Sequence, residues 1–184
     1  MTVYDQLVKE YDEQKLKMDN GEDVDKINLM FTGCALDAVD RAKELFKVDL
    51  NFSEESIKDV ENILEGLSKS IIRDKPSNDQ IFDCAKVFSS YIGQVMKLRW
   101  GGEWKDESEY SIKNGPALRV RGQDLFLLSK TYRRITNGSE DNVWHFYQVI
   151  KQDIEGTGNV EELNLEKTVH EEKRGFLKKL FGRK

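Results

Sequence analysis

The chain has 184 residues, of which 34% are charged and 38% hydrophobic, and its formal net charge is −5. This length suits one domain with a hydrophobic core of its own. Two prolines and 13 glycines are too few for a collagen-like or linker-rich chain. Acidic and basic residues are intermixed outside the last dozen positions, which argues against general nucleic-acid binding, since that requires clustered lysine and arginine.

The cysteines and the N-terminus bear on the cellular location. Cys34 and Cys84 occur in apolar segments with helical spacing, and we expect two reduced, buried thiols, because disulfides are rare in cytosolic proteins. The first residues lack the charged-then-apolar pattern of a signal peptide, and no run approaches the roughly 18 apolar residues of a spanning helix. The sequence therefore predicts a cytoplasmic protein, with peripheral membrane contact as the alternative to a purely cytosolic location.

Three helices are predicted in the first part of the chain from apolar residues three and four positions apart. The first two cover residues 2–18 and about 23–47, and the third begins after Ser53. Ser53 is predicted as the N-cap of the third helix. Glu54 and Glu55 would complement the positive end of that helix.

The fourth predicted helix has the widest apolar face, so we expect it to be central. Ser77 and Gln80 have the spacing of a capping box at its start, and Gly101-Gly102 would end it. Gly93 inside the helix costs roughly 1 kcal/mol relative to alanine, and a close helix crossing or backbone approach would explain its presence. The apolar positions are Ile81, Phe82, Ala85, Phe88, Tyr91, Ile92, Val95, Met96 and Leu98.

After the fourth helix the apolar period changes from helical to alternating. Residues 103–121 are predicted to form two or three short antiparallel strands, with Asn114-Gly115 as a hairpin turn. Helical spacing returns over 124–136, with Lys130, Arg133 and Arg134 toward the outer face. A last helix begins near Ser139 and buries Val143, Phe146, Tyr147, Ile150 and Ile154.

Charge separates the end of the chain from the rest. Residues 1–172 hold 34 acidic and 23 basic residues, a net charge of −11, whereas residues 173–184 hold six basic residues and no acidic one. We therefore predict a globular domain over 1–155, an acidic linker over 156–172 and a basic tail over 173–184. Such asymmetry is typical of an interaction tail.

The tail has the pattern of a short helix lying in a membrane surface. In a helix its large apolar residues share one face and its cations fill the remainder, which suits an anionic surface or an anionic partner. The alternatives are a solvated tail and a tail that folds back on its own acidic body. The residues are Lys173, Arg174, Phe176, Leu177, Lys178, Lys179, Leu180, Phe181, Arg183 and Lys184.

A second candidate site is the helix-to-strand junction that contains Arg99, Trp100, Glu103 and Trp104. Tryptophan and arginine are favoured at binding hot spots, so this segment is predicted to be an interface or a pocket wall. The alternative is a tight corner with two core tryptophans.

The remaining polar groups give weaker indications. The acidic run 106–109 is interpreted as a solvated loop or as an acidic face for a basic partner. His145 and His170 have no cysteine or histidine at metal-ligand spacing, and the chain has no phosphate-binding loop or dinucleotide fingerprint. We expect no metal and no cofactor.

One part of the chain resembles known proteins. Tyr91-Ile92-Gly93 in an apolar helix, the run Gly101-Gly102-Glu103-Trp104, a strand and residues 133–138 (RRITNG) resemble small bacterial proteins of uncharacterised (domain-of-unknown-function) families. Some proteins of this appearance occur in toxin–immunity systems. The resemblance covers less than half of the chain, and it implies a bacterial cytosolic binding protein without assigning catalytic residues.

Together these patterns predict a helix-dominated α+β fold, with about six or seven helices around the fourth and one small antiparallel sheet. The leading functional hypothesis is a non-enzymatic interaction module whose acidic body binds a protein partner while its tail contacts an anionic membrane surface. An immunity-type inhibitor of a toxin is one specific form. Other classes are an enzyme built around Arg99, Glu103 and His145, and a structural or oligomeric helical protein.

Overall fold

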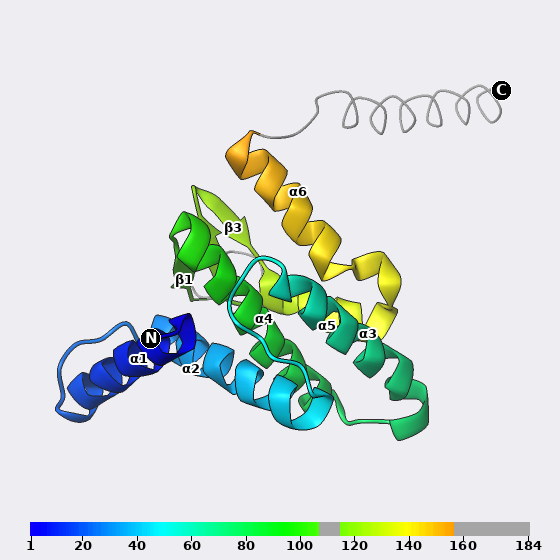
Figure 1. The fold of residues 1–184 in the computed structure, drawn as a ribbon, viewed down its shortest axis with the longest axis horizontal. Coiled ribbons are helices and arrows are strands. Elements are labelled where there is room, and N and C mark those ends of the chain that lie inside the picture. The colour runs from blue at the N-terminus through cyan, green and yellow to red at the C-terminus, as the bar shows by residue number, and fades with distance from the viewer. Residues whose placement is uncertain (107–114, 157–184) are drawn as a thin grey trace, which may run out of the picture. The chain divides into compact units, whose positions relative to one another are not determined.

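The computed structural model describes residues 1–106 and 115–156 (Figure 1). The chain divides into two units, residues 1–144 and 145–184, and each is described by itself. The described residues form six α-helices and one three-stranded antiparallel sheet. This confirms the predicted helix-dominated α+β class. The predicted boundaries at 155 and 172 stay predictions.

Two helices open the first unit, and both begin at side-chain caps. Helix α1 (Val3–Asp19) starts with a capping box between Thr2 and Asp5, and α2 (Lys26–Arg41) is capped by the Asp25 carboxylate. The segment predicted as one helix over 23–47 therefore begins later. It ends in a π-helical turn, η1 (Ala42–Phe46), after which Lys47 adopts a left-handed conformation.

Helix α3 (Ser56–Asp74) begins three residues after the predicted cap. Glu55 occupies the N-cap position, while the Ser53 hydroxyl accepts a hydrogen bond from the Ser56 backbone N–H at 3.3 Å. The buried Tyr91 hydroxyl accepts from the backbone N–H of Phe52 at 2.7 Å and lies 2.6 Å from the Ser56 hydroxyl. A side chain of the fourth helix thus positions the start of α3.

Helix α4 (Asn78–Trp100) is the central element of the first unit, as predicted. The capping box between Ser77 and Gln80 is present, and 13 of the 23 helical residues are buried. The helix packs against α2 and against α5 (Leu127–Asn137) (Figure 1). The apolar face is narrower than predicted, because Phe82 and Leu98 are about half exposed.

Gly93 of α4 lies against the Trp104 side chain. A Cβ atom at this position would lie 2.5 Å from the indole ring. That ring is itself stacked on Phe31 of α2, with 3.7 Å between the ring centroids. The glycine is therefore explained first by the Trp104 side chain, while Leu127 of a neighbouring helix, 3.2 Å from the same Cβ position, supplies the close helix contact that we predicted.

The sheet contains β1 (Glu103–Lys105), β2 (Ala117–Val120) and β3 (Gln123–Leu125) in that spatial order, all antiparallel. The third strand lies beyond the predicted range, because the backbone reverses at Arg121-Gly122, where both residues have positive φ. The following helix, α5 (Leu127–Asn137), accordingly begins later than predicted. Residues 107–114, with Tyr110, Ile112 and Asn114 of the predicted hairpin, lie outside the described residues.

Arg134 of α5 corrects the predicted orientation of that helix. Its side chain is 1% exposed, and its Nε lies 2.6 Å from Glu61 Oε1 of α3. The second oxygen of Glu61 accepts the backbone N–H of Val143 at 2.8 Å. A 3₁₀ turn, η3 (Ser139–Asp141), leads into α6 (Val143–Glu155), so this ion pair joins α3, α5 and the first residue of α6.

Candidate functional site

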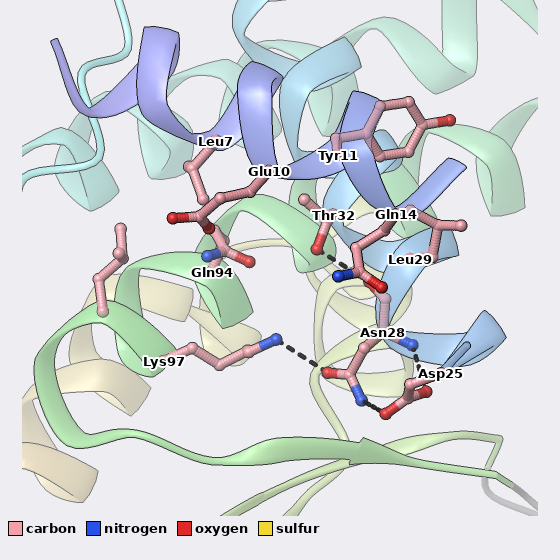
Figure 2. A pocket seen from close by; sticks show the side chains of 11 residues that line it. Leu7, Glu10, Tyr11, Gln14, Asp25, Asn28, Leu29, Thr32, Gln94 and Lys97 are labelled. Carbon is pink, nitrogen blue, oxygen red and sulfur yellow. Dashed lines mark hydrogen bonds between the residues drawn. The ribbon is translucent and has the colours of Figure 1, made fainter. Parts of the chain in front are cut away.

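A pocket of about 300 Å³ opens between α1, α2 and α4, entirely within the first unit (Figure 2). Its lining combines two carboxylates, one ammonium group, amide and hydroxyl groups and three leucines. The lining residues are Leu7, Glu10, Tyr11, Gln14, Asp25, Asn28, Leu29, Thr32, Gln94, Lys97 and Leu98.

Close packing of α1 on α2 forms one side of the pocket. Gly33 of α2 lies so near the Tyr11 ring that a Cβ atom there would be 2.9 Å from it. The Tyr4 hydroxyl donates to Asp40 at 3.2 Å, which holds the start of α1 to the same helix. Leu7 is buried. The spacing of these two helices therefore follows from apolar and aromatic residues on α1.

Asn28, in the first turn of α2, lines the pocket and connects three elements of the fold. Its Oδ1 accepts one hydrogen bond from Lys97 Nζ at 2.8 Å and another from the Trp104 backbone N–H at 3.2 Å. Its Nδ2 donates to the Asp25 carboxylate. The amide is thereby held in one orientation, and it joins α2 to α4 and to β1.

Lys97 is the only cation among the lining residues. The half-buried ammonium group makes one hydrogen bond, to Asn28, and no ion pair within 4.0 Å among the described residues. Desolvation lowers the pKa of Lys97, although the carboxylates of Asp25, Glu10 and Glu103 oppose that shift. Because an ammonium group carries three N–H donors, two remain available to a bound group.

Gln94 lies one helical turn before Lys97 and is 6% exposed. Its amide makes no hydrogen bond to a protein group within the described ranges 1–106 and 115–156, so its donor and acceptor are open to the pocket. Figure 2 shows the ends of Gln94, Glu10 and Lys97 gathered at one side of the pocket. The arrangement offers donors, acceptors and both signs of charge to a small polar molecule.

The predicted junction site adjoins this pocket but forms a corner of the core. Trp100 and Trp104 are 8% and 2% exposed. Gly101 ends α4, and Gly102 passes so close to the backbone of β2 that a Cβ atom would lie 2.5 Å from the Arg119 carbonyl oxygen. The burial of both side chains agrees with the alternative stated above, a tight corner with two core tryptophans.

Arg99 and Glu103, the two charged residues of the same junction, each form an ion pair. Arg99 pairs with Glu54 of the loop before α3, and Glu103 lies 2.8 Å from Lys105. His145, the third member of the hypothetical enzyme site, belongs to the second unit and is exposed. That Arg99 and Glu103 belong to an interface stays a prediction.

Several other predicted features fall outside the described residues. These are most of the acidic run, residues 107–109, and the whole basic tail, residues 173–184, together with His170. Both cysteines are free and only half-buried, and burial raises the pKa of each thiol. In the ranges that the structure describes, no group of three metal-ligating side chains is placed to hold an ion.

Within residues 1–106 and 115–156, no helix combines the length and the apolar character that crossing a bilayer requires.

Sequence reasoning missed the pocket because its polar residues are distributed over three helices. The available signal was in α4, where Gln94 and Lys97 follow a mostly apolar stretch of the helix. Such a change in polarity indicates a buried polar group but not its partners, since these come from segments distant in the sequence.

The fold and the pocket define a helix-dominated α+β protein with a small polar cavity. Comparison with known proteins adds no further identification, since no family model, no curated protein and no solved structure matches the chain. The resemblance drawn from the GGEW segment therefore receives no support from these comparisons.

Proposed function

We propose that this protein is a non-enzymatic interaction module whose acidic body binds a basic protein partner and whose basic tail contacts an anionic membrane surface. The observation that carries the proposal is the opposition of charge between residues 1–172, at −11, and residues 173–184, at +6. Charge of one sign attracts partners of the other and raises their rate of association.

The described residues support an acidic binding face at the N-terminus. Residues 1–25 hold eight carboxylates and three lysines, and all eleven side chains are exposed. Within residues 1–25, all of which the structure describes, the only ion pair joins Lys9 and Glu13, whose charged atoms are 3.9 Å apart. The surplus of negative charge is thus directed to solvent, where it can meet a basic surface. An inhibitor that covers a basic toxin is one form of such a module.

The sequence of the tail supports membrane contact. Each cation near an anionic surface contributes on the order of 1 kcal/mol, and the apolar residues add to this on insertion. Phe176, Leu177, Leu180 and Phe181 provide that apolar part. The combination suits reversible attachment and not a permanent anchor.

Co-sedimentation with lipid vesicles tests the tail. We expect the full chain to sediment with vesicles that contain phosphatidylserine and to stay in solution with purely neutral vesicles. Residues 1–172 should stay in solution with both, and salt should weaken the binding because it screens charge. A full chain with Phe176→Ser and Phe181→Ser keeps the charge and should bind less. Equal sedimentation of the full chain and residues 1–172 would refute a role for the tail.

The acidic face is tested separately with a basic protein of known structure, such as lysozyme, as a probe of electrostatic association. Full chains carrying both Glu22→Gln and Asp23→Asn should associate more weakly at low salt than the wild type. The matched control neutralises the Asp153 and Glu155 carboxylates. An equal loss from both sets would show that net charge alone, and not this face, governs association.

A further inference from the structure

The pocket between α1, α2 and α4 shares only Glu10 and Asp25 with the acidic face of residues 1–25, and the proposed function assigns the pocket itself no ligand. Its walls come from three helices that are capped and packed, so its shape is set by the fold. A volume of about 300 Å³ lies at the lower end of the range for small-molecule sites. Its ligand, then, is small.

The charges in the lining select the class of ligand. Lys97 would repel a simple cation, and the carboxylates of Glu10 and Asp25 would repel a simple anion. A ligand with one charge of each sign meets neither penalty if its two ends are placed correctly. This reasoning favours a zwitterion over a singly charged molecule.

The available hydrogen-bonding groups give the orientation. Asp25 is occupied by Asn28, from which it accepts two hydrogen bonds, one from the backbone N–H and one from the side-chain amide. Glu10 accepts one hydrogen bond, from Gln6 at 3.0 Å, which leaves its second oxygen available. The Lys97 ammonium group has two unused N–H donors, and Figure 2 shows its nitrogen on the opposite side of Gln94 from Glu10.

We propose that this pocket binds a small zwitterion of the amino-acid class, with its carboxylate on Lys97 and its ammonium group on Glu10. Gln94 lies between these charges and supplies an amide donor and acceptor to either end. The leucines of the lining, Leu7, Leu29 and Leu98, provide apolar contact for the remainder of the ligand. A free amino acid and a short peptide both carry this chemistry.

Isothermal titration of the full chain tests the assignment. The probes are the 20 standard amino acids and a set of dipeptides, with propionate and ethylamine as analogues of alanine that each lack one charged group. We expect saturable binding of at least one zwitterion, and binding of each one-group analogue at least about tenfold weaker, a difference of about 1.4 kcal/mol. Preference for single amino acids or for dipeptides identifies the source of the ligand.

Variants then locate the ligand. Lys97→Met and Glu10→Gln should each weaken binding at least about tenfold, because each removes a hydrogen bond to a charged group. Lys86→Met, on the same helix, and Glu13→Gln, on the same face of the chain's first helix, do not alter the pocket lining and should bind as the wild type does. Circular dichroism verifies the fold, and Lys97→Gln replaces Lys97→Met if the latter does not fold.

Three results would overturn the assignment. The first is no saturable binding of any zwitterion at millimolar concentration. The second is binding that Lys97→Met or Lys97→Gln leaves unchanged, and the third is equal affinity for propionate or ethylamine. The tail variants separate this inference from the proposed function, because loss of vesicle binding on removal of residues 173–184 should leave the affinity of the pocket unchanged.

Discussion

Arg134 and Lys97 are cations in the interior of the same unit, but their surroundings differ. Arg134 is 1% exposed and pairs with Glu61, whose other oxygen accepts the backbone N–H of Val143. Lys97 faces a pocket and has one hydrogen bond, to Asn28. A charge enclosed by its partners holds elements together, whereas a charge with unused donors beside a cavity is available to a ligand. The comparison distinguishes a structural cation from a binding one.

Breaking the Arg134 pair should have the largest effect on stability. Arg134→Met leaves the Glu61 carboxylate buried without its cation, so we expect the free energy of unfolding to fall by about 3–5 kcal/mol. Urea denaturation measures this loss. The matched control is Arg133→Met, because Arg133 is 54% exposed and lies 3.5 Å from Asp141. It should change stability by no more than about 1 kcal/mol. Similar losses in the two variants would contradict the comparison.

Gly93→Ala should displace Trp104. We expect it to have an intermediate effect on stability and to change the pocket as well. Gly93→Ala places a methyl group against the indole ring, and overpacking of this kind costs about 1–3 kcal/mol. Since the Trp104 backbone N–H donates to Asn28, the anchor of Lys97 would also shift.

The control for that variant is Gly66→Ala in α3, where the added methyl group meets open space. It should stabilise the protein by roughly 0.5–1 kcal/mol, because alanine is the better helix former. Thermal unfolding compares the two. If Gly93→Ala proved as stable as Gly66→Ala, the close contact with Trp104 would not constrain this position.

Lys97→Met should have the smallest effect on stability at neutral pH, about 1 kcal/mol or less in either direction. The variant loses a hydrogen bond to Asn28 but no longer buries part of a charged group. A small change here, beside a large one for Arg134→Met, would sharpen the distinction between the two cations.

The pH dependence of Lys97→Met gives a second readout. The pKa of Lys97 is lower in the folded protein than in the unfolded chain, so the unfolded chain binds more protons between the two pKa values. The stability of the wild type relative to Lys97→Met should therefore rise with pH from the lowered pKa to the ordinary lysine value. Denaturation at several alkaline pH values measures this. A constant difference between the two proteins would show that Lys97 titrates normally.

Local signals in the sequence predicted most of the helices correctly. The capping box of Ser77 and Gln80, the apolar period of α4 and the stop at Gly101-Gly102 all operate within a few residues. Errors arose where another segment takes part. The start of α3 depends on Tyr91, which lies 35 residues from Ser56. The third strand depends on pairing with β2 and not on its own pattern.

The candidate site, like the fold, has features that depend on local sequence and features that depend on tertiary packing. The sequence by itself determined the helix-dominated class, the central position of α4 and the charge opposition on which the proposed function rests, because these follow from composition and local spacing. Only the tertiary structure decided that Arg134 is buried and that Lys97 faces a pocket. The reason is physical, since their partners Glu61 and Asn28 lie 73 and 69 residues away, and burial and pairing at such separations depend on how the helices pack.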